Sequence, residues 1–97
     1  MLQVLILPSA KADINRIWHR TVRRWDETQA FKYLDKIHVR IERLSVLPNI
    51  GKTIGDAEKG YRSLRAEEHL IIYRILGETV EVARILHKKM NLPRHLP

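Results

Sequence analysis

The stretch that most restricts the fold is residues 61–87, YRSLRAEEHLIIYRILGETVEVARILH, a long apolar run interrupted by arginines. Its content of Ile, Val and Tyr is typical of β-strands. Gly77 and Glu78 divide its second half at a two-residue turn, with glycine where a type II′ turn requires a positive φ. The run therefore predicts three consecutive strands, the last two forming a hairpin in which Leu76 lies opposite Thr79.

The register of this hairpin assigns a neighbour to each charged residue. Arg74 lies opposite Glu81, and we expect a cross-strand ion pair worth about 0.2–1 kcal/mol of stability. Arg84 lies across from Ile71 and has no acid opposite. Its guanidinium must pack on the Tyr73 ring, reach solvent at the rim of the sheet or bind a partner, and the sequence leaves these alternatives open. The two predicted faces are Leu70, Ile72, Arg74, Glu81, Ala83, Ile85 and His87 on one side, and Ile71, Tyr73, Ile75, Val80, Val82, Arg84 and Leu86 on the other.

The N-terminal segment LQVLIL predicts a further strand, which is apolar on both faces and therefore expected inside a sheet. Pro8 ends this strand, and Ser9 is expected to cap a helix that begins near Ala10. Asp13 is the only acid on the polar side of that helix, where it lies favourably in the first turn. The apolar stripe consists of Ile14, Ile17, Trp18, Thr21, Val22 and Trp25, and the polar side carries Lys11, Arg16, Arg20, Arg23 and Arg24.

A second helix follows the break at WDETQA. Asp26, with Gln29 three residues later, is similar to a capping box. The apolar residues of this helix recur at alternating four- and three-residue spacing, so it is expected to pack on the first helix as an antiparallel hairpin. Pro48 ends it, because the residue before a proline disfavours the α conformation. The apolar seam consists of Ala30, Leu34, Ile37, Ile41 and Leu44.

The remaining segments are predicted to be irregular. Residues 49–60, NIGKTIGDAEKG, read as a loop, and residues 88–97 as a tail that caps the sheet. The element order is then strand, helix, helix, loop and three strands in one domain, residues 1–97. This order predicts an α+β fold in which the helical hairpin covers one face of a small, mostly antiparallel sheet. The first strand joins at an edge or beside a later strand, and the open face is expected to be rich in arginine.

The charge balance indicates an anionic partner. Eighteen Lys and Arg against eleven Asp and Glu give a net charge of +7, which favours nucleic acid or an acidic protein, although a solvated basic surface also fits. The absence of cysteine excludes disulfides and cysteine-ligated zinc and fits a reducing, cytoplasmic compartment. The apolar run of residues 2–7 is too short for a signal or membrane segment.

Motifs for catalysis or cofactor binding are weak. GKT at residues 51–53 lacks the leading glycine of a phosphate-binding loop, and the histidines lack metal-ligand spacing. We therefore expect no metal and no cofactor. His87, at a strand end beside arginines, has two interpretations. It is either a general acid or base in RNA cleavage, with the cations stabilising the transition state, or a packed residue of the strand end.

Several segments together resemble the ParE branch of the RelE/ParE toxin superfamily of bacterial toxin–antitoxin modules. They are PSAKADINRIW, the pattern A-x-x-YL-x-x-I at residues 30–37, L-x-x-LPNIGK at residues 44–52, GYRSLRAEEHLIIYR, and VARILHKKMNLPRHL. The resemblance covers essentially the whole chain. It implies a βααβββ fold, neutralisation by a ParD-type antitoxin in a hetero-oligomer, and DNA gyrase as the target, without enzymatic activity.

The sister RelE branch cleaves ribosome-bound mRNA and typically carries a tyrosine, or a histidine–tyrosine pair, near the C-terminus. Here Arg62, Arg65, Arg84 and His87 match part of that arrangement, but Lys88 follows His87 where an aromatic residue is expected. A ribosome-dependent endoribonuclease is therefore the alternative function. A non-toxic module that only binds the antitoxin is a third.

Two sets of residues follow from these interpretations. The candidates for contacts with a protein partner, or with gyrase-bound DNA, are Arg62, Arg65, Tyr73, Arg84, His87, Lys88, Lys89 and Met90. The residues predicted to have structural roles are Ile14, Ile17, Trp18, Leu34, Ile37, Ile41, Leu44, Arg74 and Glu81.

Overall fold

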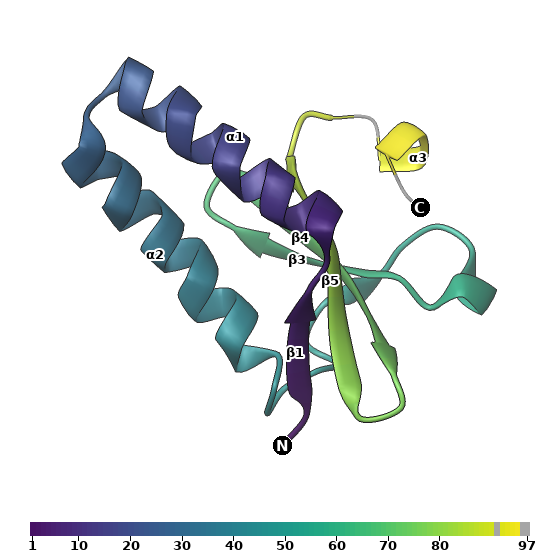
Figure 1. The fold of residues 1–97 in the computed structure, drawn as a ribbon. Helices are drawn as coiled ribbons and strands as arrows, with labels where there is room; N and C mark the ends of the chain where they lie inside the picture. Colours follow the sequence, from purple (N-terminus) through teal and green to yellow (C-terminus); the bar gives the residue numbers. More distant parts are fainter. Residues whose placement is uncertain (91, 96–97) are drawn as a thin grey trace.

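The computed structural model describes residues 1–90 and 92–95, and the arrangement of its elements is shown in Figure 1. Two long helices form a hairpin on one side of a five-stranded sheet. This confirms the predicted α+β class with its helical hairpin. The elements are β1 (Gln3–Ile6), α1 (Pro8–Arg24), α2 (Glu27–Arg43), β2 (Lys52–Thr53), the 3₁₀ turn η1 (Ala57–Lys59), β3 (Arg62–Ala66), β4 (His69–Leu76), β5 (Thr79–His87) and α3 (Leu92–His95).

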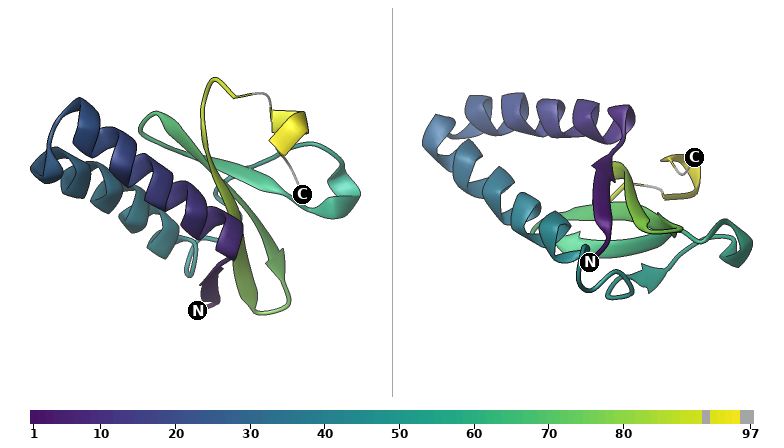
Figure 2. Two further views of the ribbon diagram at one scale, coloured as in Figure 1. Left: turned by 45° about the horizontal axis from the view of Figure 1, so that its top comes forward. Right: turned by 60° about the horizontal axis from the view of Figure 1, so that its bottom comes forward.

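The strands lie in the order β1-β5-β4-β3-β2, with β1 parallel to β5 and the other neighbours antiparallel. The first strand is therefore an edge strand beside the last one, as the element order predicted, whereas the expectation from its two apolar faces that it lies inside the sheet is wrong. Val4 and Ile6 pack on the helix-side core, and the alternate residues Gln3 and Leu5 are exposed on the other face. Figure 2 shows how α1 and α2 meet at one end and diverge toward the sheet.

The core lies between the helical hairpin and the sheet. Ile17, Ile37, Ile41 and Leu44 are buried there, and Ile14 and Leu34 pack against them, as predicted. Trp18 is only half-buried, and its ring packs edge-on against Phe31 with centroids 4.7 Å apart. On the opposite face of the sheet a smaller apolar cluster contains Tyr61, Ile72, Ala83 and Leu86, with Leu92 of α3 packed against it.

The two long helices begin in different ways. Asp26 caps α2 as expected, because its carboxylate accepts a hydrogen bond from the Gln29 amide at 2.7 Å. The expectation that Ser9 caps the first helix is wrong: α1 begins at Pro8, two residues before the predicted start at Ala10, and Leu7 occupies the cap position without a side-chain bond. Proline suits this first position because its φ is already helical and no amide is lost.

The β4–β5 hairpin follows the predicted register only near its turn. Leu76 pairs with Thr79 and Arg74 with Glu81, and Gly77 has the positive φ of 59° that the turn requires. A register shift between Ile72 and Tyr73 leaves one extra residue in β5, so Arg84 lies opposite Ile72 rather than Ile71. The bulge exchanges the faces predicted for the next two residues, since Ile85 joins the helix-side core and Leu86 the opposite cluster.

The segments predicted to be irregular contain short elements. Within residues 49–60 the structure forms β2 and η1, and in the tail it forms α3. The loop is held to the sheet by Tyr73, whose hydroxyl donates to the Pro48 carbonyl and accepts from the Gly51 amide, both at 2.8 Å. Gly51 is required at this close approach, because a Cβ there would lie 2.6 Å from the Tyr73 hydroxyl.

Candidate functional site

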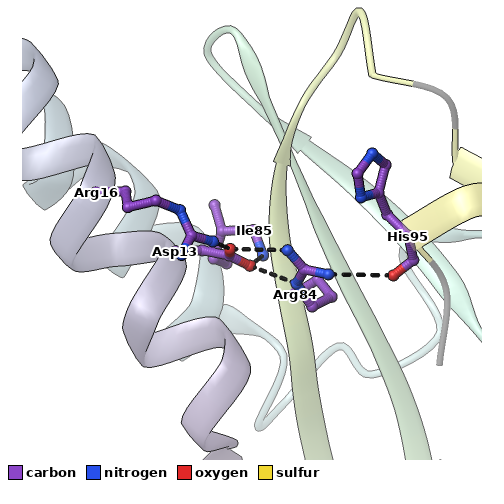
Figure 3. Close-up of polar contacts among 5 residues, drawn as sticks. All are labelled: Asp13, Arg16, Arg84, Ile85 and His95. Carbon is purple, nitrogen blue, oxygen red and sulfur yellow. Dashed lines mark hydrogen bonds and ion pairs between the residues drawn. The ribbon is translucent and has the colours of Figure 1, made fainter.

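Arg84 forms an ion pair with Asp13 of α1, and not with an acid of a neighbouring strand. Its Nε donates to Asp13 Oδ2 at 2.8 Å and its Nη2 to Asp13 Oδ1 at 3.0 Å (Figure 3). The same carboxylate accepts from the Ile85 amide at 2.9 Å and pairs with Arg16. The hydrogen bonds that Arg84 donates to Asp13 raise the pKa of Arg84 above its usual value. Asp13 is therefore a buried anchor, and its predicted position on the polar side of the first helix is wrong.

The other three arginines of residues 61–87 also have internal partners. Arg62 donates to the Gly51 carbonyl at 2.8 Å, Arg65 donates to the Glu67 carbonyl at 2.9 Å, and Arg74 pairs with Glu81 at 3.3 Å as predicted. The four guanidinium groups thus bind four different partners within the chain. The expected arginine-rich open face is not formed, because each group satisfies local backbone or carboxylate oxygens.

The prediction for Tyr73 is also wrong. It was predicted to contact a partner, but its side chain lies in the helix-side core and is 0% exposed. Burial raises the pKa of its hydroxyl above the usual value. With both of its hydrogen bonds directed at the loop after α2, Tyr73 has a structural role.

The basic side chains gather instead in a groove between α1 and the ends of β4 and β5, with a volume of about 1290 Å³. We call it the cationic groove. From α1 and its C-cap it is lined by Arg16, His19, Arg20, Arg23, Arg24 and Trp25, from α2 by Tyr33, and from the sheet end by Glu68, His69, His87, Lys88, Lys89 and Met90.

The positive charges of the cationic groove exceed its negative charges. Its two acids, Asp13 and Glu68, are engaged with Arg84 and Lys88, respectively. Within residues 1–90 and 92–95, no carboxylate forms an ion pair with Arg20, Arg23, Arg24 or Lys89. An anionic ligand could therefore bind these four cations without breaking an internal ion pair.

Three ring side chains meet at the inner end of the cationic groove. Tyr33 of α2 lies with its hydroxyl 2.6 Å from His69 Nδ1, and the rings of His69 and His87 are 5.3 Å apart in an edge-on arrangement. The Glu68 amide donates to the Tyr33 hydroxyl at 3.1 Å, so this hydroxyl joins the loop before β4 to His69. His87 Nδ1 accepts from the Lys89 amide at 3.1 Å.

These contacts and charges set the protonation of the cluster. Burial, reinforced by the nearby His87 and Arg20, lowers the pKa of His69 to about 4, so His69 is neutral at pH 7. Burial also raises the pKa of Tyr33 above its usual value. A neutral imidazole has one N–H donor and one acceptor nitrogen. His69 thus contributes hydrogen-bonding atoms to the groove and no charge.

The structure brings together only part of the predicted set. His87, Lys88, Lys89 and Met90 line the cationic groove, whereas Arg62 and Arg65 do not. The α1 arginines, Tyr33 and His69 were not among the predicted site residues. The arginines of α1 recur on one helical face, which was a usable signal, but the meeting of Tyr33 with His69 depends on how α2 packs on the sheet.

A second groove, about 600 Å³ in volume and mostly apolar, opens between α1 and α2. Its wall includes Ile14, Trp18, Phe31 and Leu34, and Phe31 is 66% exposed. We call it the interhelix groove. Charged side chains contribute only at its edge, through Lys32, Asp35 and His38.

Neither a membrane-spanning helix nor a metal-binding cluster is found in the described part of the chain. No helix among them is both long and apolar enough to cross a membrane. In residues 1–90 and 92–95, no three or more His, Asp or Glu side chains are grouped so that they could hold a metal ion.

Comparison with known proteins adds independent information. The family described as "ParE toxin of type II toxin-antitoxin system, parDE" matches residues 4–92. Toxin ParE1 of Mycobacterium tuberculosis is 39% identical over 93 residues, which are 95% of each chain, and Toxin ParE1 of Caulobacter vibrioides is 36% identical over 87 residues, 90% of each. The solved chromosomal ParDE system from P. aeruginosa shares the fold, with a TM-score of 0.78, 22% identity, and coverage of 90% of this chain and 96% of that chain.

Proposed function

Because the chain belongs to the ParE toxin family of type II toxin–antitoxin systems, we propose that it inhibits DNA gyrase by binding rather than by catalysis. In this proposal the cationic groove, with His87, Lys88, Lys89 and Met90 at its sheet end, contacts gyrase or the DNA that gyrase holds. The proposed target lies in the cytoplasm, which is where the toxin would act.

The internal hydrogen bonds of the strand arginines favour binding over cleavage. Arg62, Arg65 and Arg84 are the cations that a ribonuclease would need near His87, yet each is hydrogen-bonded to internal oxygens. A guanidinium that is committed to Asp13 is poorly placed to stabilise charge that develops on a phosphate. The free cations line α1 instead, where they suit a macromolecular surface.

We propose that a ParD-like antitoxin occupies the interhelix groove with an amphipathic segment. Apolar side chains at helical spacing would fill the space beside Trp18 and Phe31, as in other helix-in-groove complexes. Acidic residues flanking that segment would meet the net charge of +7. The resulting complex is a hetero-oligomer in which the toxin is inactive.

A supercoiling assay with purified gyrase tests the proposed function. Relaxed plasmid, ATP and gyrase are incubated with increasing amounts of the protein, and supercoiled and cleaved DNA are separated on agarose. We expect loss of supercoiling or accumulation of cleaved DNA, and relief of either by the antitoxin. Unchanged supercoiling at a large molar excess of folded protein would reject gyrase as the target.

The Tyr33–His69–His87 cluster favours a second candidate function, cleavage of ribosome-bound mRNA. In that reaction a 2′-hydroxyl loses its proton as it attacks the adjacent phosphorus, the bond to the 5′-oxygen breaks, and the departing 5′-oxygen takes up a proton. His87, once released from the Lys89 amide, would be the group that exchanges these protons. Primer extension on translated mRNA after induction tests this function. New cleavage sites that vanish in His87→Ala would support it, and full toxicity of His87→Ala without such sites would reject it.

A further inference from the structure

We propose that the cationic groove binds single-stranded nucleic acid directly, with phosphates on its α1 cations and a base stacked on Trp25. This inference concerns the isolated chain and does not rest on gyrase as the target. It gives a role to arginines of α1 that were placed on the polar side of the helix and were not among the predicted site residues.

The row of cations is the first observation. Arg20, Arg23 and Arg24 follow one side of α1, and Lys89 lies across the groove. From Arg20 to Arg24 the helix rises by about 6 Å, and Lys89 continues the positive charge to the opposite wall, so the charge is extended rather than a single point. A linear polyanion fits such a row better than a small anion does, because successive phosphates can each meet a guanidinium.

An exposed aromatic ring at the rim is the second observation. Trp25 is 66% exposed, and the Arg24 guanidinium lies 5.9 Å from its ring centroid. An indole face beside cations is the arrangement on which unpaired bases stack in proteins that bind single strands. A paired base in a duplex has no free face to offer, which is why the proposal names single strands.

The histidines at the inner end supply the third observation. The Nδ1 atom of His69 is occupied by the Tyr33 hydroxyl, and the Nδ1 atom of His87 accepts from the Lys89 amide, so Nε2 is the ring atom that each histidine leaves for a ligand. Both rings line the groove beside Lys88 and Lys89. An imidazole N–H beside cations suits a phosphodiester, whose oxygens accept hydrogen bonds. An acidic peptide would also meet the cations, but it has no base to stack on Trp25.

Fluorescence anisotropy of labelled single strands tests the proposal. The full chain is titrated into fluorescein-labelled dT15 at 50 and 200 mM NaCl, pH 7. Four phosphate contacts predict roughly 50-fold weaker binding at the higher salt, from a slope of about −0.7 per contact. The probe rU15 is expected to bind within about threefold of dT15, because phosphates and base faces are common to both.

Matched variants distinguish the contribution of the cationic groove to binding from that of the overall positive charge. Arg20→Gln/Arg23→Gln is expected to reduce the salt effect to roughly sevenfold, as two lost contacts predict. Arg43→Gln/Arg94→Gln removes the same charge from exposed residues outside the groove and should leave the salt effect unchanged. Trp25→Ala should weaken binding by about fivefold or more, whereas Phe31→Ala, which removes an equally exposed ring from the interhelix groove, should not.

Four results would overturn the proposal: equal effects of the groove and control pairs, unchanged binding by Trp25→Ala, tenfold tighter binding of a 15-base-pair duplex, or tenfold tighter binding of rU15. A 15-residue polyglutamate that bound as tightly as dT15, with the same sensitivity to the variants, would assign the groove to an acidic protein instead. Circular dichroism of each variant confirms that it is folded before its affinity is compared. Gyrase is absent from every measurement, so these outcomes are independent of the supercoiling assay.

Discussion

Asp13 of α1 holds Arg84 of β5 through two hydrogen bonds, of 2.8 and 3.0 Å, between residues 71 positions apart in the chain. The carboxylate is 3% exposed and also accepts from the Ile85 amide, so it joins the first helix to the strand just after the bulge. On the far side Arg84 donates to the His95 carbonyl at 3.3 Å. One ion pair thus connects the helix layer, the sheet and the C-terminal segment.

Replacement of Asp13 by alanine is expected to lower the free energy of unfolding by about 3 kcal/mol or more, because it leaves the Arg84 guanidinium and the Ile85 amide without their acceptor. Urea denaturation followed by circular dichroism measures the loss. Asp35→Ala, at an exposed site on α2, is the control and should change stability by less than about 0.5 kcal/mol. Equal stability of the two variants would contradict the anchoring role.

His69 predicts a loss of stability in mild acid. Its pKa is lowered to about 4 in the folded chain, against about 6.5 when unfolded, so the unfolded state binds the proton more readily. The contribution is complete above pH 6.5 and is lost as the pH falls toward 4. Because His69 is only partly buried, we expect a loss of about 1–2 kcal/mol.

Urea midpoints at pH 7.0, 5.5 and 4.5 measure this dependence. In His69→Gln the loss between pH 7.0 and 4.5 should shrink, whereas His38→Gln, at an exposed site on α2, should retain it. A histidine resonance of the folded protein that titrates near pH 6.5 and is assigned to His69 would contradict the prediction.

Tyr73→Phe is expected to lower the free energy of unfolding by about 1–3 kcal/mol, because the Gly51 amide and the Pro48 carbonyl lose their shared partner inside the protein. Tyr61→Phe provides the comparison, since no hydrogen bond of its hydroxyl is found in the described part of the chain. Thermal denaturation of both variants checks the difference, and a melting temperature of Tyr73→Phe equal to that of Tyr61→Phe would refute it.

Ile37→Asp is expected to abolish cooperative unfolding, because a carboxylate at a position that is 1% exposed has no partner in the helix-side core. Val39→Asp places the same charge two residues along α2, at a side chain that is 47% exposed, and should remain folded. Near-ultraviolet circular dichroism during heating distinguishes the two. A normal transition in Ile37→Asp would show that the helical hairpin is packed differently.

The elements that were predicted well are those with strong local signals. The apolar seam of α2 located Ile37 and Ile41 in the core, the Asp26 cap marked the start of the helix, and the turn at Gly77 set the pairing of Arg74 with Glu81. Each depends on residues a few positions apart, where periodicity, capping and turn geometry act directly.

The site was predicted poorly for the opposite reason. The sequence predicted an arginine-rich open face, but the bulge in β5 and the carboxylate of Asp13 redirect Arg84. Neither feature has a local signal, because Asp13 reaches Arg84 and the Ile85 amide only where α1 packs on β5. The position of Tyr33 beside His69 depends on how α2 packs on the sheet, and that of Trp25 at the rim of the cationic groove depends on α1.

The sequence by itself therefore determined the class of fold, the helical hairpin, the hairpin turn and the excess of positive charge, because these properties follow from short-range geometry and from composition. Only the tertiary structure decided which cations remain free. That outcome depends on which carboxylate and carbonyl oxygens lie within hydrogen-bonding distance of each guanidinium. In this chain Asp13 of α1 binds Arg84, whereas Arg20 and Arg23 line the cationic groove.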